Sequence, residues 1–251
     1  MSYKFIIYLK SNKVSSLEIK KNSIAIIGWH DGGAGRIESW FEKTHNYHVA
    51  CFINPSDTPL NINSKLIKRG SKEFSYPVKN KFKKKPLINK KKWAEYLIKV
   101  GINKALITTD DSLQRYKEIK YAKKMKIKLV NAIHPSVNIM PGAKVKDNVI
   151  LHEGSYIGYK VELKDGVIID GAYLGHHTII KECSTLLAGS VTGGNVVIGK
   201  FTKVYLGAII SNKIEIGKNC IIGAGSLILK NIKSKKLVAQ KTSNIIIENN
   251  V

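Results

Sequence analysis

The sequence predicts two unlike halves, an α/β domain with a mainly parallel sheet followed by a parallel β-helix. In residues 23–131, short apolar runs alternate with amphipathic stretches of helical period, the order typical of a parallel sheet covered by helices. From Ile133 onward an aliphatic residue recurs every six positions, and self-similarity at a fixed short period marks a solenoid. We therefore divide the chain into an N-terminal appendage (1–22), an α/β domain (23–131) and a β-helix with a C-terminal tail (132–251).

Composition favours a globular protein that binds anions. The chain has 42 Lys+Arg against 18 Asp+Glu, a formal net charge of +24, which attracts polyanions such as nucleotides or coenzyme A. Much of this charge fits solvated lysines in a chain also rich in Ile and Asn, and no nucleic-acid-binding motif accompanies it, so nucleic acid is not an expected partner. The three cysteines form no CxxC pair, and no apolar run is long enough for a signal peptide or a membrane span. We expect a soluble, cytoplasmic protein.

The elements of the first half follow from its apolar runs. The run SIAIIG ends in the glycine-rich GWHDGGAGR, so a strand, a glycine loop and a helix should follow one another. The Lys-rich stretch 61–85 reads as a surface excursion with at most a short element. Together the runs predict a small Rossmann-like parallel sheet preceded by two strands of the appendage. Strands are expected at 3–10, 14–20, 23–28, 48–53, 104–108 and 126–130, and helices at 37–43, 91–100 and 112–124.

The second half reads as roughly sixteen hexapeptides, from IHPSVN at Ile133 to IGKNCI and its successor, with a shortened unit LKDGV at 163–167. Three units make one triangular coil of about 18 residues, whose first and fifth side chains point inward. Glycines should occupy corners where the backbone turns left-handed. The tail from Lys233 should leave the stack, with strand-like pieces at 237–239 and 245–247 as a cap.

Both halves together resemble the bacterial nucleotide-sugar acetyltransferases, through SIAIIGWHDGGAGR, ALITTDDSLQRYKEI, KLVNAIHPSVNIMPGA and the hexapeptide array. That family includes the sialic acid O-acetyltransferases and the N-acetyltransferases of UDP- or GDP-linked 4-amino-sugars. The resemblance extends from about residue 23 to residue 230. It implies a left-handed β-helix, a homotrimer, and acetyl-CoA bound as co-substrate in the cleft between adjacent coil stacks.

The stretch DGAYLGHH matches the family's catalytic histidine, which assigns His176 as the general base that deprotonates the attacking sugar amine or hydroxyl. The family usually has Asp or Glu next, but here His177 follows. The partner of the base is therefore open between His177, Asp170 and an acidic group of a neighbouring subunit. Gly194 matches a glycine whose N–H points at the thioester oxygen, although its spacing fits equally well a glycine that only turns the corner. His134 and His152 stack one coil apart without a third histidine, so no metal is expected.

The resemblance also implies binding residues. At the glycine loop and helix start, backbone N–H groups favour a nucleotide diphosphate, while two further loops match positions that contact the nucleoside. The expected substrate-binding residues are Gly33, Gly35, Arg36, Asn54, Thr109 and Asp110. Small residues of successive coils should line the pantetheine of coenzyme A, and these are Gly194, Asn195, Leu206, Gly207, Ala224 and Gly225.

The sequence thus predicts an enzyme that transfers an acetyl group from acetyl-CoA to the amino group of a nucleotide-linked sugar, for surface-polysaccharide or glycoprotein assembly. An amine is favoured because it is more nucleophilic than a hydroxyl, so that one histidine base suffices. Two alternatives stay open. One is O-acetylation of a sialic acid or related sugar, and the other is a β-helix scaffold that binds a nucleotide sugar without turnover.

Overall fold

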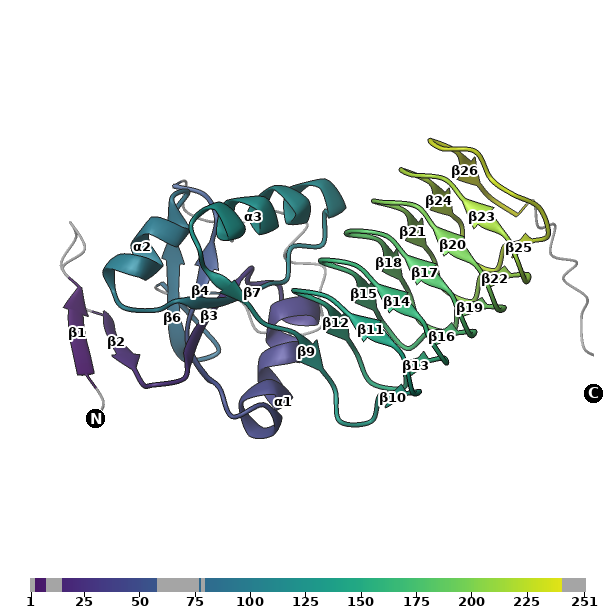
Figure 1. Cartoon of the computed structure of the whole chain (residues 1–251). Coiled ribbons are helices and arrows are strands. Elements are labelled where there is room, and N and C mark those ends of the chain that lie inside the picture. The colour runs from purple at the N-terminus through teal and green to yellow at the C-terminus, as the bar shows by residue number, and fades with distance from the viewer. Residues whose placement is uncertain (1–2, 8–14, 58–76, 78–79, 241–251) are drawn as a thin grey trace, which may run out of the picture.

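The computed structural model describes residues 3–7, 15–57, 77 and 80–240, and it divides into an α/β half and a stack of triangular coils beside it (Figure 1). An antiparallel hairpin of β1 and β2 precedes the α/β half, and Leu17 of β2 is buried in its core. Within the described ranges, no helix is long and apolar enough to cross a bilayer. The elements of the first half are β1 (Tyr3–Ile7), β2 (Ser15–Ile19), β3 (Ser23–Ile27), η1 (Asp31–Gly35), α1 (Arg36–Thr44), β4 (His48–Asn54), β5 (Lys81–Phe82), β6 (Lys85–Asn89), α2 (Trp93–Lys99), β7 (Lys104–Ile107), α3 (Ser112–Lys124) and β8 (Lys128–Leu129).

The sheet of the first half runs in the order β5-β6-β4-β3-β7-β8, and all its pairs are parallel except the edge pair β5–β6. Alternating side chains of β3 point to opposite faces, as a strand requires. Ile24 and Ile26 pack with Ile37 and Phe41 of α1 on one face, whereas Ile27 packs with residues of α2 and α3 on the other. The expected parallel sheet with covering helices is therefore present.

Two details differ from the sequence-based expectation. The strand β6 follows the Lys-rich excursion and pairs in parallel with β4, although no strand was expected there. Its sequence KPLIN has only two large apolar residues and a proline, so it carries no clear strand pattern. The expected last strand shortens to two residues, because Lys126 takes a positive φ of 59° and turns the chain before it.

The second half is a parallel β-helix with three flat faces (Figure 1). Face I contains β9 (Ala132–Ile133), β12 (Ile150–Leu151), β15 (Ile168–Ile169), β18 (Thr185–Leu186), β21 (Lys203–Val204), β24 (Ile221–Ile222) and β26 (Leu237–Val238). Face II contains β10 (Asn138–Ile139), β13 (Tyr156–Ile157), β16 (Tyr173–Leu174), β19 (Val191–Thr192), β22 (Ile209–Ile210) and β25 (Leu227–Ile228). Face III contains β11 (Lys144–Val145), β14 (Glu162–Leu163), β17 (Ile179–Ile180), β20 (Val197–Ile198) and β23 (Glu215–Ile216). We call the corners between consecutive faces edge I–II, edge II–III and edge III–I.

The hexapeptide pattern fixes this shape. The second residue of each strand points inward, and so does the small or β-branched residue four positions later, as Leu151 and Ser155 illustrate. Strands pair with the equivalent strands of neighbouring coils, so every inward residue stacks on its counterpart. Several left-handed corner positions hold residues other than glycine, including His177 (φ 56°) and Asn195 (φ 59°).

Two expectations about the repeats were wrong. The shortened unit is not LKDGV. Ile150 still pairs with Ile168, which is one full coil period further along the chain. The next pair, Tyr156 with Tyr173, is separated by one residue fewer, so the shortening comes after Ile168. The missing residue is therefore at edge I–II, where Gly171 (φ 61°) permits the tighter turn. The tail does not leave the stack at Lys233, since β26 pairs in parallel with β24. The expected strand at 245–247 lies outside the described residues.

Candidate active site

A pocket of about 540 Å³ lies where the carboxyl ends of β3, β4 and β7 meet face I and edge I–II of the β-helix. Loops at the carboxyl ends of parallel strands are the usual ligand site of such sheets. The α/β half contributes Gly28, Trp29, His30, Gly32, Gly33, Asn54, Pro55, Thr108, Thr109 and Asp110, and the β-helix contributes His152, Ile168, Asp170, Thr185 and Leu187. Among the predicted substrate residues, Gly33, Asn54, Thr109 and Asp110 thus share one cavity.

The glycine loop differs from the expected anion cradle. It forms the π-helical turn η1, in which the amides of Gly33 and Gly35 both donate to the carbonyl of His30 at 3.1 Å. These two N–H groups are therefore already paired within the turn. Gly33 still lines the pocket, whereas Gly35 is not among the residues that do.

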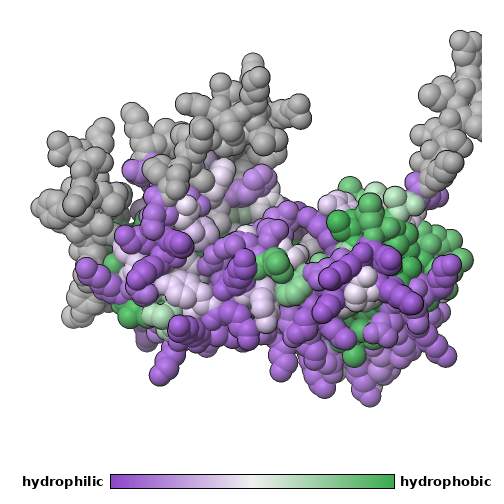
Figure 2. Space-filling view, turned by 90° about the horizontal axis from the view of Figure 1, so that it is seen from above, coloured by the Kyte–Doolittle hydropathy of each residue, from purple (hydrophilic) through white to green (hydrophobic). Residues whose placement is uncertain are grey.

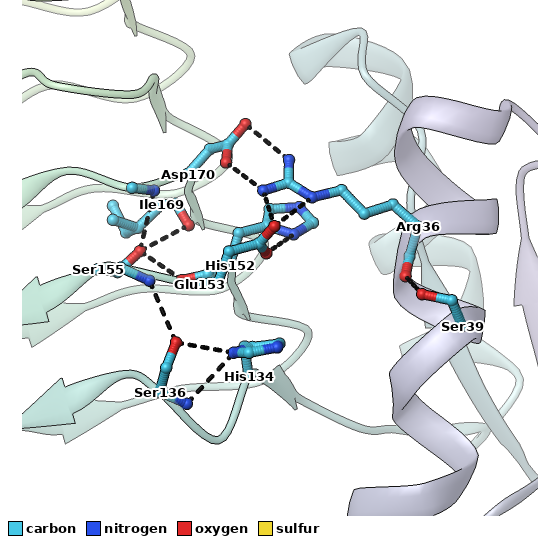
Figure 3. A network of polar contacts seen from close by, with 11 residues as sticks. Arg36, Ser39, His134, Ser136, His152, Glu153, Ser155, Ile169 and Asp170 are labelled. Atoms are coloured by element: carbon cyan, nitrogen blue, oxygen red, sulfur yellow. Dashed lines mark hydrogen bonds and ion pairs between the residues drawn. The ribbon is translucent and has the colours of Figure 1, made fainter.

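Arg36, the first residue of α1, turns toward edge I–II instead of the pocket. Its guanidinium pairs with Glu153 at 2.7 Å and with Asp170 at 3.1 Å (Figure 3). Burial lowers the pKa of Arg36, but the hydrogen bonds to these two carboxylates outweigh burial and raise it. Asp170 thus pairs with Arg36 on edge I–II, and face II separates it from His176, so within one chain Asp170 is not a partner of His176.

His152 is a pocket residue that sequence analysis considered only as a metal ligand. Its side chain is buried, and its Nδ1 has no hydrogen-bond partner among the described residues, the nearest carboxylate oxygen of Glu153 being 3.9 Å away. Burial, and then the nearby charge of Arg36, lower the pKa of His152, so the imidazole is neutral at pH 7. The equal spacing of His134, His152 and Asp170 along edge I–II was the sequence signal that these side chains stack.

The remaining predicted substrate residues are held by specific bonds. Asn54 donates from Nδ2 to Asn89 Oδ1 at 2.8 Å. The carbonyls of Thr109 and Asp110 accept from Nη1 of Arg115, and the exposed carboxylate of Asp110 pairs with Lys203 of the β-helix at 3.2 Å.

The predicted catalytic residues lie on a different corner, edge II–III. His176 and His177 are exposed, with their Nδ1 atoms 3.0 Å apart and their rings nearly perpendicular. His177 occupies the left-handed corner position, donates its amide to the carbonyl of Tyr159, and packs its ring edge-on against the Tyr159 ring. His177 therefore lies beside His176 at the position where the family resemblance implies a carboxylate.

Gly194 supports the ring of His176 from the next coil. A Cβ at Gly194 would lie 2.4 Å from His176 Nε2, whereas the left-handed position of this corner belongs to Asn195. The glycine is thus required for the close approach of the imidazole and not for the turn. The amide of Gly194, the expected donor to the thioester oxygen, donates to Asn212 Oδ1 at 2.7 Å.

The other predicted coenzyme A residues do not share this corner. Leu206, Gly207, Ala224 and Gly225 lie on edge I–II, between strands of faces I and II, whereas Gly194 and Asn195 lie on edge II–III. Within one chain, the width of face II separates the two sets. A groove of about 520 Å³ beside His177 is lined by Gly142, Lys144, Lys160, Glu162 and Ile179 in addition. Across the described part of the chain, no three His, Cys, Asp or Glu side chains are grouped as metal ligands would be.

Comparison of the sequence with protein-family models and with curated proteins finds no match. Solved structures with the same fold are found. PerB from Caulobacter crescentus, in complex with CoA and GDP-perosamine, has 21% identity and a TM-score of 0.71, with 87% of this chain and 94% of that chain covered. The acetyltransferase domain of PglB from Neisseria gonorrhoeae, in complex with acetyl coenzyme A, has 19% identity and a TM-score of 0.72, with 90% of this chain and 100% of that chain covered. The chain therefore shares its left-handed β-helix fold with these two proteins.

Proposed function

We propose that this protein is an acetyl-CoA-dependent N-acetyltransferase acting on the amino group of a nucleotide-linked sugar. The observation that carries the proposal is the exposed His176 imidazole, which rests on Gly194 and contacts His177 through Nδ1. This arrangement leaves Nε2 as the free basic nitrogen when Nδ1 of His176 donates to Nδ1 of His177. A fold shared with proteins solved with CoA, acetyl-CoA and GDP-perosamine supports the same reaction class.

The reaction is an acyl transfer in two linked steps. The sugar amine attacks the thioester carbonyl, a C–N bond forms, and His176 Nε2 accepts the proton that the amine loses. The C–S bond then breaks, and coenzyme A leaves as a thiolate that regains a proton. His177 acts as a positioning residue, because when its Nδ1 accepts from Nδ1 of His176 the basic lone pair of His176 stays on Nε2.

The pocket at the strand ends is the proposed nucleotide-sugar site. Trp29 offers a broad ring to a base, and the small residues Gly28, Gly32 and Gly33 leave room beside it for a ribose or diphosphate. The wall formed by the β-helix contains Asp170 and the neutral His152, and it suits the hydroxyl groups of a sugar better than a diphosphate, because carboxylates repel phosphates.

A complete site needs a second copy of the chain. The pocket and four of the predicted coenzyme A residues follow edge I–II, whereas His176 stands on edge II–III together with Gly194 and Asn195. Between the edges, face II presents an apolar ladder of Tyr156, Tyr173, Val191, Ile209 and Leu227. Exposed apolar side chains also gather over the C-terminal coils (Figure 2). Covering this ladder with a second copy in a homotrimer would bring edge I–II of one copy to edge II–III of the next.

Thiol release from acetyl-CoA tests the proposal, with a panel of UDP-, GDP- and dTDP-linked amino-sugars as acceptors. We expect turnover with one acceptor, and loss of at least about 100-fold in kcat for His176→Ala. His134→Ala is the matched control, because His134 is on edge I–II outside the pocket lining, and it should retain activity. Nucleotide-sugar binding without thiol release would identify a scaffold, and turnover only with hydroxyl acceptors would identify an O-acetyltransferase.

A further inference from the structure

Three residues in equivalent positions of successive coils stack along edge II–III: His176, Gly194 and Asn212. The amide of Gly194 has one hydrogen, and it donates to Asn212 Oδ1 at 2.7 Å, a near-ideal length. Gly194 is buried, whereas Asn212 is exposed. The backbone N–H expected to meet the thioester oxygen is therefore occupied by a side chain of the next coil.

Two adjacent glycines make room for this arrangement. A Cβ at Gly193 would lie 2.3 Å from Asn212 Oδ1, and a Cβ at Gly194 would lie 2.4 Å from His176 Nε2. Neither glycine has a positive φ, so space and not backbone conformation requires them. The Gly193–Gly194 turn thus receives the imidazole from one neighbouring coil and the carboxamide from the other.

The bond to Gly194 also orients the carboxamide. Only the oxygen of Asn212 can accept from an N–H, so Nδ2 must point away from Gly194. Nδ2 finds no hydrogen-bond partner among the described residues, so its two hydrogens remain available on the same edge as His176. A donor held by a fixed bond needs little reorganisation when charge develops nearby.

We propose that the side-chain amide of Asn212, and not the backbone N–H of Gly194, donates to the thioester oxygen during acyl transfer. The inference rests on the proposed function. When the amine forms the C–N bond, the carbonyl electron pair moves to oxygen, and Nδ2–H stabilises that charge without transferring its proton. The pair returns to the carbonyl as the C–S bond breaks, and the hydrogen bond weakens again. Gly194 acts as a positioning residue, because its amide holds Asn212 Oδ1.

The test compares kcat and KM of Asn212→Ala and Asn212→Asp with the unmodified chain, using acetyl-CoA and the acceptor found active in the panel. Asn212→Ala removes the donor, and we expect kcat to fall by about 100- to 1,000-fold with KM nearly unchanged. Asn212→Asp keeps an oxygen for the Gly194 amide but has no N–H, so its kcat should fall at least as far. A merely structural role for Asn212 would be rescued by Asp.

Asn231→Ala is the matched control, because Asn231 Oδ1 likewise accepts a backbone N–H, that of Glu215, at 2.9 Å. It should keep full kcat. If Asn212→Ala keeps or raises kcat, the freed Gly194 amide is the donor and the inference is overturned while the acetyltransferase function stands. If the unmodified chain turns over no acceptor, both the function and the inference fail.

Discussion

His152 is the one histidine that is buried within the described ranges, and its neighbours determine its charge. Arg36, Glu153, Asp170 and His134 are the charged or titratable groups that influence it. Burial disfavours the imidazolium first, and the guanidinium of Arg36 adds to that effect, so the pKa of His152 lies below its ordinary value of 6.5 in the folded chain. The pocket wall therefore presents a neutral ring although two carboxylates are close by.

This depressed pKa predicts acid sensitivity. His152 binds a proton more readily in the unfolded chain than in the folded chain. Its contribution to the free energy of unfolding is therefore complete above about pH 6.5 and is lost as pH falls through the pKa of the folded state. We expect the thermal midpoint to fall less between pH 7.5 and pH 5 for His152→Gln than for the unmodified chain. Melting curves across this range check it, and parallel curves for both proteins would contradict it.

Gly194 supplies a second residue-scale prediction. Because its added Cβ would overlap the exposed His176 ring and not buried backbone, Gly194→Ala should displace the imidazole without unfolding the coil. A displacement of a catalytic group by about 1 Å can cost on the order of 100-fold in rate, and His176 is the proposed base. We expect that loss in kcat with an unchanged circular dichroism spectrum. The coil period places His176, Gly194 and Asn212 on one edge, but the hydrogen bond from the Gly194 amide to the Asn212 side chain is not encoded in that period.

At the scale of elements, α3 joins the two halves through Arg115. This fully buried side chain uses all five of its N–H donors: Nε bonds Gly166, Nη1 bonds the carbonyls of the Thr109–Asp110 loop, and Nη2 bonds Cys183 and Thr185. The loop that lines the pocket is thereby tied to edge III–I and face I of the β-helix.

Replacing Arg115 should be costly. Arg115→Met leaves several buried carbonyls without donors, and we expect the free energy of unfolding to fall by roughly 3–5 kcal/mol. Lys123→Ala is the control on the same helix, because its ion pairs with Asp147 and Asp165 are partly exposed and should contribute less than about 1 kcal/mol. Urea unfolding of both variants measures the difference. Equal losses would show that α3 does not depend on Arg115.

The elements also show how far sequence patterns reach. The helix expected at 112–124 matches α3 at both ends, because Asp111 caps its first turn by accepting from the amide of Gln114. The hexapeptide period likewise identifies the coils from local sequence alone, because each repeat carries its own inward-pointing residues. The missing residue at edge I–II was misplaced, because LKDGV and IIDGAY contain equally good turn residues and only strand pairing decides between them.

For the whole molecule, the apolar ladder of face II should drive self-association. Ile209 is half exposed on this face, and burying such a row against another copy is the usual fate of a large apolar patch. We expect light scattering to give the mass of a trimer, and Ile209→Lys to give monomers without activity. Glu215→Lys, at the equivalent outward position of face III, is the control and should remain assembled. A monomeric unmodified chain would contradict the prediction.

The site illustrates why sequence alone identified its parts but not their grouping. The coil period predicts which residues stack on one edge, so His176 and Gly194 were correctly paired in register. Which edge of the β-helix a residue occupies depends on how the three faces of a coil close into a triangle. In the folded chain, Leu206 and Ala224 lie on the other side of face II from the histidines. Similarly, Arg36 donates hydrogen bonds to Glu153 and Asp170, which are far from it in the sequence. No local sequence pattern predicts these contacts.

The shortened coil has a consequence for how such a protein can change over time. Although edge I–II lacks one position there, Tyr173 still pairs with Tyr156, and the following strand of face II, at Val191, returns to the full period. A corner therefore absorbs a change of length without shifting the strands that follow. Insertions or deletions at this corner can reshape the wall of the proposed nucleotide-sugar pocket while the proposed catalytic residues on edge II–III stay in register. In the proposed enzyme, acceptor preference and catalytic power are thus separable traits, open to independent drift and to independent engineering.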